Sequence, residues 1–504
     1  MVAGRGVLRS LDSFLNEYKR SRFGVLGLAI IAFFVILALA APLLTSYNPI
    51  TDQNLASPYS IPLWAKNFPQ YTQYPVNSQL LVGTELSTQS ELQMWRITTK
   101  GPVTLVGESG GIVAKFNPNA SLGETSTLIL QQTFYYPWTY PCTFSIGVTI
   151  TPLDKTLSTS DASVDIYLQP NSATPFHLLG PAVYTDPGDS LEYFSSFPKG
   201  QPTTLVADPA IPDVNLLATG SPVVTSMGAC GLAQGIFRPG NFTLTFEVAS
   251  QVPSSILISN PYLHVVGRAF GWLGTDELGR DIWSQFVYGA RTSLIVGLTA
   301  ALMSVVIGTL VGLVSGFKGG LTDEALMRFN DFLLVIPFLP FILVILIIVE
   351  LSHAVAWANT ELIIIVLLGV LSWNGIARVI RSQVMTVKHR LFVEASRGLG
   401  ASDRHIIYKH ILPNVMGLVY ANLALTVPGA ILTEAALSFL GFGDPSVVSW
   451  GTVVSASAFA TTSSLGFAWW WFLPPGLAIA LLSTSFVLVG FSLDSILNPK
   501  LRRR

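Results

Sequence analysis

Few side chains in this sequence stand where they could do chemistry. Glu434 is the one carboxylate well inside a long apolar run, and an ionisable group in such surroundings is by default a functional candidate. It suits a gate or a substrate path, and it equally suits a hydrogen bond between two helices. Cys142 and Cys230 are the only cysteines. An even pair in an oxidising compartment predicts one disulfide, with two buried free thiols as the alternative.

A few other polar and aromatic residues are candidates that also have ordinary structural explanations. Asp276, Glu277 and Asp281, in GTDELGRD, could bind a cation, but solvated carboxylates and turn caps use the same residues. Trp138, in FYYPWTYP, could stack on a sugar or could fill a core with its neighbours. The core and cap interpretations are the expected ones.

The residue patterns of common enzymes are not visible. No Ser/His/Asp, Cys/His or H-E-x-x-H arrangement is visible, and no G-x-x-x-x-G-K-[ST] loop would cradle phosphates. His405 and His410 are five residues apart, the wrong face relation on a helix for a metal pair. We therefore expect no enzyme activity, no cofactor and no metal in this chain.

The elements that position these residues are those of a membrane protein. Of the 504 residues, 50% are hydrophobic and only 11% are charged, against about 25% charged in soluble domains. A helix needs about 20 apolar residues to cross the hydrocarbon core of a bilayer. Six stretches qualify: 23–44, 292–317, 332–351, 362–380, 415–439 and 471–493. The net charge of −1 gives no reason to expect nucleic acid as a partner.

The placement of positive charge predicts the orientation. Segments 1–22, 317–331, 378–413 and 494–504 hold 18 of the 28 Lys and Arg residues, whereas the loops 352–361 and 440–470 hold none. By the positive-inside rule both termini are cytoplasmic, including the basic tail 496–504. The first span, 23–44, has a cleaved signal peptide as its alternative, because Ala38-Leu39-Ala40 resembles a cleavage site.

Residues 49–265 have a different pattern and are predicted to lie outside the cell membrane. Short alternating runs such as NFTLTFEVAS, separated by turn residues, favour an all-β sandwich. Both cysteines fall here, as do two N-x-[ST] glycosylation candidates, Asn119 and Asn241. After this domain, 271–291 has apolar residues at near-helical spacing, which predicts an amphipathic helix at the outer membrane surface before the core 292–495.

The polar stretch EASRGLGASDRHIIYKHILP, 394–413, separates two of the predicted spans. A short helix over 391–399 can end at Gly400 in the left-handed conformation. Ser402 or Asp403 can cap a second helix, which Pro413 is expected to interrupt. The second helix would carry its isoleucines and His410 along one side. These side chains need a partner, which is either this chain's own helix ends or another protein.

This stretch resembles the EAA loop of ABC-importer permeases, E-A-A-x3-G-x9-I-x-L-P. Glu394, Ala395, Gly400 and the final Leu-Pro413 match it, whereas Ser396 and His410 replace Ala and Ile. HILPN, GLGASD, GTDELGRD, TEAALSFLGFG and SWG resemble the dipeptide/oligopeptide permease branch in particular. The resemblance covers about 1–48 and 265–504 and leaves out the β domain.

The resemblance implies a fold and a set of partners. The fold is the six-helix permease of type-I ABC importers, here with a large extracytoplasmic β domain inserted between helices 1 and 2. The loop 390–413 would dock on a cytoplasmic ATPase through Glu394, Ala395, Gly400, Ala401, Ser402, Asp403, His410 and Pro413. A second permease, two ATPases that bind ATP and Mg, and an extracytoplasmic substrate-binding protein would complete the importer.

Other functions remain open at this point. The preferred substrate is a di- or oligopeptide, and an oligosaccharide importer of the same family is the alternative. A membrane-anchored surface-binding protein would use the β domain and need no coupling loop. A secondary transporter usually shows internal repeats, and no convincing repeat is visible here.

Overall fold

The computed structural model describes residues 18–108, 110–118, 124–170, 173–179, 196–207, 231–352, 360–444, 446–460 and 468–497. The chain divides into two compact units. Gln53–Asp281 contains the strands and is called the β domain below. Met1–Asp52 together with Ile282–Arg504 contains the long helices and is called the membrane unit.

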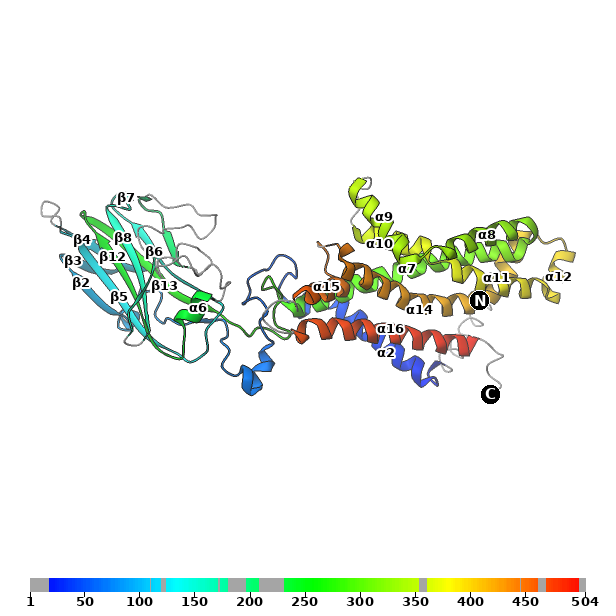
Figure 1. The fold of residues 1–504 in the computed structure, drawn as a ribbon, viewed down its shortest axis with the longest axis horizontal. Helices are drawn as coiled ribbons and strands as arrows, with labels where there is room; N and C mark the ends of the chain where they lie inside the picture. The colour runs from blue at the N-terminus through cyan, green and yellow to red at the C-terminus, as the bar shows by residue number, and fades with distance from the viewer. Residues whose placement is uncertain are drawn as a thin grey trace, which may run out of the picture. The chain divides into compact units, whose positions relative to one another are not determined.

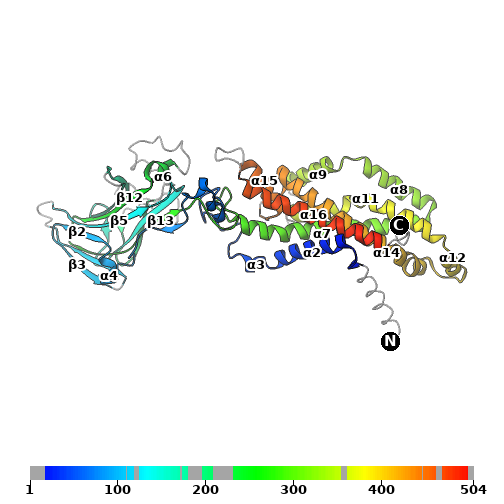
Figure 2. The same ribbon diagram turned by 90° about the horizontal axis from the view of Figure 1, so that it is seen from below.

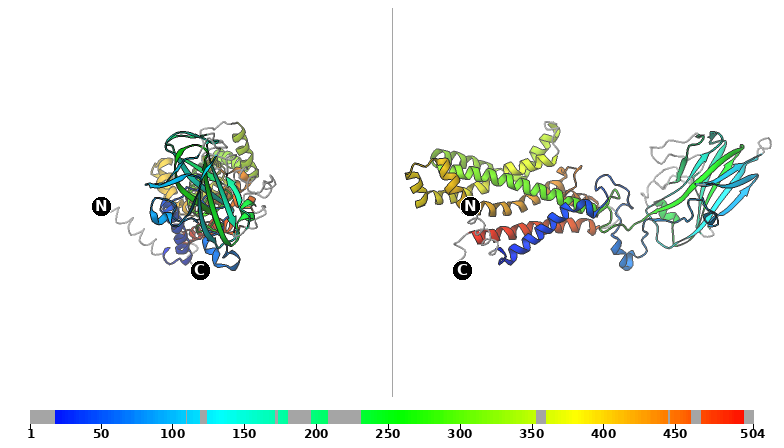
Figure 3. Two further views of the ribbon diagram at one scale, coloured as in Figure 1. Left: turned by 90° about the vertical axis from the view of Figure 1, so that its left-hand side faces the viewer. Right: turned by 180° about the vertical axis from the view of Figure 1, so that it is seen from behind.

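The β domain is a sandwich of two antiparallel sheets (Figures 1 and 3). One sheet has the order β11-β6-β13-β4-β3, with β1 also on β13, and the other has the order β2-β5-β12-β8-β9. A small third sheet pairs β10 with β7. The strands are β1 (Ser78–Gln79), β2 (Arg96–Lys100), β3 (Val103–Glu108), β4 (Gly111–Phe116), β5 (Ser126–Tyr136), β6 (Thr143–Pro152), β7 (Leu157–Ser158), β8 (Ala162–Pro170), β9 (Phe176–Leu179), β10 (Ser196–Phe197), β11 (Thr203–Ala207), β12 (Gly240–Ser250) and β13 (Ser254–Val266). Two short helical turns, η1 (Leu63–Asn67) and η2 (Pro69–Tyr71), precede the strands, and α4 (Gln89–Leu92) and α6 (Gly231–Ile236) lie between strands.

The alternation of apolar residues along the strands builds the core between the sheets. In β12, Phe242, Leu244, Phe246 and Val248 are all buried, while the residues between them are partly exposed. Successive side chains of a strand point to opposite faces, so one face of each strand joins a single apolar cluster. Trp138 packs edge-on against Tyr136, with ring centroids 5.5 Å apart, and belongs to this cluster's margin. Its position favours the core interpretation over sugar stacking.

The remaining candidates in the β domain have structural explanations or lie partly outside the described residues. Asp276 is fully buried and accepts hydrogen bonds from the backbone N–H of Leu278 and Arg280, each at 2.9 Å, and from Arg280 Nε at 2.6 Å. It is a turn cap with an ion pair, as the cap interpretation expects. Cys142 is buried and disulfide-bonded. Cys230 and Asn119 lie outside the described residues, so the pairing stays a prediction, and Asn241 lies exposed on β12.

The membrane unit is a bundle of long helices, in which α2 and α16 lie side by side in Figures 1 and 2. Its elements are α2 (Arg22–Leu39), α3 (Ala41–Leu44), α7 (Ile282–Lys318), α8 (Gly320–Val335), α9 (Phe338–Ser352), α10 (Thr360–Leu371), α11 (Asn374–Lys388), α12 (Leu391–Gly398), α13 (Asp403–Ile406), the π turn η5 (Ile407–Ile411), α14 (Leu412–Leu437), the π turn η6 (Ser438–Phe442), α15 (Trp450–Ala460) and α16 (Trp469–Leu497). Among the described residues, five helical stretches are long and apolar enough to cross a membrane, or six if the bent pair α8 and α9 is one span.

Two expectations about these helices are wrong. The segment 271–291 is not a separate surface helix, because α7 begins at Ile282 and continues without a break to Lys318. No proline interrupts this run, and its polar residues are covered by the chain itself: Ser284 is buried and hydrogen-bonds Thr45 at 2.6 Å. The predicted span 332–351 is broken at Ile336–Pro337, where α8 and α9 meet at 84°. Pro337 forces Ile336 into an extended conformation, with ψ 127°.

Glycines allow the helices of the membrane unit to approach closely. A Cβ on Gly308 would lie 2.8 Å from Ile376, and one on Gly312 would lie 2.7 Å from the carbonyl oxygen of Ala377. The pair therefore brings α7 against α11. Gly297 does the same for α7 and α14, since a Cβ there would overlap the side chain of Ile431.

Candidate functional site

The turn between α12 and α13 is built as the sequence predicts. Gly400 has φ +84°, in the left-handed region. The N–H of Gly400 donates to the carbonyl of Arg397 at 3.0 Å, and the N–H of Ala401 donates to the carbonyl of Ser396 at 3.1 Å. These two bonds make a Schellman motif, which ends α12 and reverses the chain. Ser402 then caps α13, because its Oγ accepts from the N–H of His405 at 3.4 Å.

Pro413 does not end the helix that follows, contrary to expectation. The backbone passes from α13 through the π turn η5 into α14, which makes one helical stretch from Asp403 to Phe442. A proline inside a helix lacks an N–H and clashes with the carbonyl four residues back. The wider π turn removes this conflict, and the N–H of Leu412 donates to Ile407 in the five-residue register. Asn414 Nδ2 also donates to the carbonyl of His410 at 2.7 Å.

The two faces of this loop have different environments. Val393, Ile406 and Ile411 are buried and join an apolar cluster with residues of α7, α11 and α14. The isoleucines therefore pack against the chain's own helices. Glu394, Ala395 and Asp403 are exposed, and so are the large apolar side chains of Leu391 and Leu399, at 83% and 89%. An exposed surface with both polar and large apolar residues remains available to a partner.

The two histidines of the loop lie near one another and near an aromatic ring. The rings of His405 and His410 are 6.0 Å apart, and Phe392 lies 6.1 Å from His410. Within the described parts of the chain, no group of three or more His, Cys, Asp or Glu side chains could hold a metal ion. His410 is half-buried beside Phe392, where the family pattern has isoleucine.

Polar contacts that the sequence analysis missed tie α11, the helix before the loop, to α7 and α8. Arg381 forms a two-point ion pair with Asp323 of α8, Nε and Nη2 each 2.5 Å from a carboxylate oxygen. Ser315 of α7 hydrogen-bonds the same carboxylate. Lys388 Nζ donates to the carbonyl of Gly316 at 2.9 Å.

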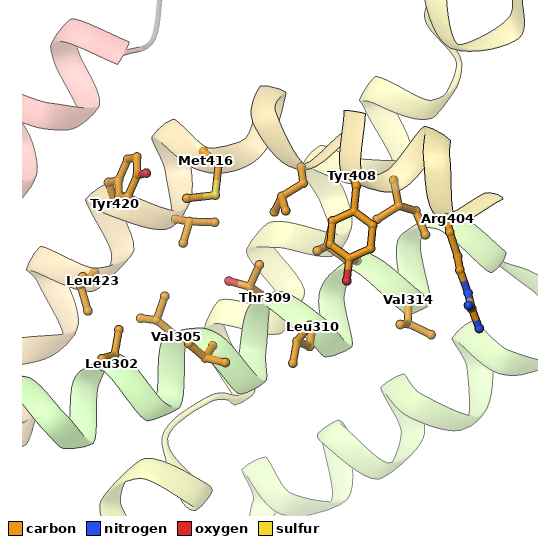
Figure 4. A pocket seen from close by; sticks show the side chains of 15 residues that line it. Leu302, Val305, Thr309, Leu310, Val314, Arg404, Tyr408, Met416, Tyr420 and Leu423 are labelled. Carbon is orange, nitrogen blue, oxygen red and sulfur yellow. The ribbon is translucent and has the colours of Figure 1, made fainter. Parts of the chain in front are cut away.

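A second feature that the sequence analysis missed is an apolar groove of about 630 Å³ between α7 and the 404–423 stretch (Figure 4). Tyr408 and Arg404 lie at one end of it and Tyr420 lies at the other. Its α7 side carries Leu302, Val306 and Leu310, and a stripe at this spacing is the signal that could have found it.

Glu434 lies near the end of α14 and is 5% exposed. Its Oε1 accepts from Ser438 Oγ at 2.9 Å and from Ser449 Oγ at 2.7 Å. The bond to Ser449, outside α14, agrees with the tertiary hydrogen-bond interpretation. Its second oxygen, Oε2, is also buried and has no hydrogen-bond partner among the described residues. A structural hydrogen bond therefore accounts for Oε1 of Glu434 but not for Oε2.

Comparison with known proteins gives this geometry a family. Residues 308–503 match the family described as binding-protein-dependent transport system inner membrane component, and residues 11–61 match the N-terminal TM domain of oligopeptide transport permease C. The chain is 41% identical over 233 residues to the oligopeptide transport system permease protein OppC of Bacillus subtilis (strain 168), across 46% of this chain and 72% of that protein. It is also 41% identical over 233 residues to the dipeptide transport system permease protein DppC of the same strain, across 46% of this chain and 69% of that protein. A chain of the MetNI methionine ABC transporter aligns at a TM-score of 0.34 and 18% identity, across 43% of this chain and 95% of that one.

The helices and the loop are those of a transporter's membrane component. The chain belongs to the family of binding-protein-dependent transport system inner membrane components. It is a multi-pass membrane protein and a transport subunit without an ATP site of its own. Neither family match includes residues 62–307, so most of the β domain is outside the part that these relatives explain.

Proposed function

We propose that this chain is the permease subunit of an ATP-driven ABC importer that carries dipeptides or oligopeptides across the cytoplasmic membrane. The observation that carries the proposal is the 41% identity to relatives named for oligopeptide and dipeptide transport. The matched region includes the Gly400 turn and the exposed surface around it.

The loop 390–413 is the proposed contact with the ATPases. ATP and Mg are bound by two partner ATPase subunits, and this chain binds none itself. The exposed side of α12, with Glu394 and Ala395, fits a groove on an ATPase, and Gly400, Ala401, Ser402 and Asp403 hold the turn that presents it. His410 and Pro413 set the start of α14. A charged hydrogen bond across such a contact is worth about 1.5–3 kcal/mol.

The remaining partners and the orientation follow from the same proposal. Both termini and the loop 390–413 face the cytoplasm, and the β domain lies outside. A second permease subunit completes the path through the membrane, and an extracytoplasmic binding protein delivers the substrate. The distribution of Lys and Arg supports this orientation.

Reconstitution tests the proposal. The chain is purified with its second permease and its ATPases, and the complex is placed in liposomes. ATP is supplied on the side of the membrane where the ATPases lie, and substrate-loaded binding protein is supplied on the opposite side. Uptake of labelled di- and oligopeptides, with ATP hydrolysis rising in step, is the expected result. Uptake of an oligosaccharide but of no peptide would assign the chain to a sugar importer instead. A single cysteine at position 402 that reacts with an impermeant reagent from outside would overturn the orientation.

A further inference from the structure

A small acidic pocket lies within the membrane unit. It is formed where α7, α10, α14, η6 and the segment leading into α15 meet, and its volume is about 10 Å³. A cavity of that size holds about one water molecule or one ion of similar radius. Three carboxylates line it, together with four hydroxyl groups and no Lys or Arg: Glu361, Glu434 and Asp444, with Thr292, Ser438, Ser449 and Thr452.

Glu434 is the buried member of the three. Both hydroxyl groups that reach it, those of Ser438 and Ser449, donate to the same oxygen, Oε1. Oε2 is buried without a partner in the described structure. A buried carboxylate oxygen left unpaired strongly destabilises a fold, so this oxygen calls for a ligand in the pocket.

The charges around the pocket decide the kind of ligand. Glu361 and Asp444 line the same pocket as Glu434. Asp444 uses Oδ1 to accept from the backbone N–H and the hydroxyl of Ser446, at 2.9 and 2.6 Å. Three acids that share one pocket without a basic side chain in its lining repel one another, and a cation removes that repulsion.

The geometry points to a site for one compact monovalent cation, with Oε2 of Glu434 as its central ligand and with Glu361 and Asp444 flanking it. Within the described chain no group of three or more His, Cys, Asp or Glu side chains could hold a metal ion, so the site offers Glu434 as its one close carboxylate. An alkali ion or a primary ammonium group can be bound by one close carboxylate together with hydroxyl oxygens. The ammonium group could be the free amino end of a peptide, and that source alone rests on the proposed function.

The first test measures binding, independently of transport. The purified complex is heated in solutions of equal ionic strength that contain sodium, potassium, methylammonium or the bulky N-methylglucamine cation. A ligand that binds the native state alone raises the unfolding midpoint. We expect sodium, potassium or methylammonium to raise it above the N-methylglucamine value in the wild-type complex. The Glu434→Gln variant keeps an oxygen for both serines and should lose the effect, with affinity roughly tenfold or more weaker.

Two further variants make the result decisive. Glu361→Gln removes a flanking charge from a half-exposed position and should weaken the same effect, even if Glu434→Gln fails to fold. Glu324→Gln is the matched control, because Glu324 is an exposed acid of the same unit that pairs with Arg328. It should leave the cation effect unchanged. Equal midpoints in all four salts, or a cation effect that survives both pocket variants, would overturn the site.

The second test identifies the source of the cation. If sodium or potassium is the ligand, peptide uptake by the wild-type complex should depend on that ion and lose the dependence in Glu434→Gln. If the substrate's ammonium group is the ligand, free peptides should be preferred over N-acetylated ones, and the preference should fall in the variant. A complex that transports no peptide but shows the thermal effect retains the site and loses the proposed function. A complex that transports peptides but shows no thermal effect retains the proposed function and loses the cation site.

Discussion

Alanine at position 400 changes the turn between α12 and α13 without adding a contact. A Cβ at Gly400 would meet no atom within 4 Å, so steric overlap contributes nothing. The free-energy cost comes from the backbone, because φ is +84° at this position. The left-handed conformation is less favourable for an L residue by about 1–2 kcal/mol. The native turn should therefore become about 5- to 30-fold less populated relative to its alternatives. Valine at the same position should cost more, since a β-branched residue tolerates this region least.

Gly398 supplies a matched control two residues away. A Cβ there would also meet nothing within 4 Å, but Gly398 is the last residue of α12 and has no positive φ. Alanine in a helix is favoured over glycine by about 0.5–1 kcal/mol. Gly398→Ala should therefore be neutral or slightly stabilising. Any difference between the two alanine variants then reports the left-handed turn alone.

The assay is ATP hydrolysis by the reconstituted complex, with and without substrate-loaded binding protein, alongside uptake. We expect Gly400→Ala to reduce the stimulated rate and the uptake about 5-fold or more, and Gly398→Ala to retain both. Membrane insertion should be normal in both variants, because the helices that cross the membrane are unchanged. Equal stimulation in the wild type, Gly400→Ala and Gly400→Val would refute the coupling role of this turn.

Four further predictions concern the rest of the chain. Glu394→Lys should abolish stimulated hydrolysis while the purified complex keeps its unfolding midpoint, and a lowered midpoint would show a structural role instead. Arg381→Ala should lower the stability of the membrane unit by about 1.5–3 kcal/mol in thermal unfolding, and exchange of Arg381 and Asp323 should restore part of it. Gly312→Val should lower the free energy of unfolding of the membrane unit by about 1–3 kcal/mol, because its side chain would force α7 away from α11. Gly375→Ala, where a Cβ meets no atom within 4 Å, should leave the thermal unfolding midpoint unchanged. Burial raises the pKa of Asp165, so the folded β domain retains that proton longer than the unfolded chain does. The contribution of Asp165 to stability is thus present below about pH 4 and lost as pH rises through the raised pKa, and Asp165→Asn should flatten this part of a pH series of unfolding midpoints.

Local patterns in the sequence were enough to predict the main elements. The apolar runs placed the long helices because length and composition alone decide whether a helix can cross a bilayer. Alternation in β12 and its neighbours predicted the sandwich, since a half-buried strand must alternate. The turn at Gly400 was predictable for the same reason, because a helix stop, a glycine and a capping Ser402 all lie within a few residues.

Features that depend on how distant segments meet were not predictable in this way. Pro337 stands where α8 and α9 meet, but the neighbouring residues do not encode the 84° angle between the two helices. The polar start of α7 looked like a surface helix because the sequence does not show that Ser284 would be covered by Thr45. The acidic pocket could not be predicted for the same reason. Glu361 and Glu434 are 73 positions apart in the sequence and line one pocket only in the folded bundle.

The position of α11 links the loop 390–413, the proposed contact with the ATPases, to the rest of the bundle. Only His389 and Arg390 separate α11 from α12, so a displacement of α12 acts directly on the end of α11. Arg381 and Lys388 fix that end of α11 to α8 and to the last turn of α7, and the glycines of α7 leave no space between the two helices. Packed helices of this kind move as a body and do not deform gradually. We expect such a movement to be absorbed at the break between α8 and α9, because the extended conformation of Ile336 already interrupts the helix there.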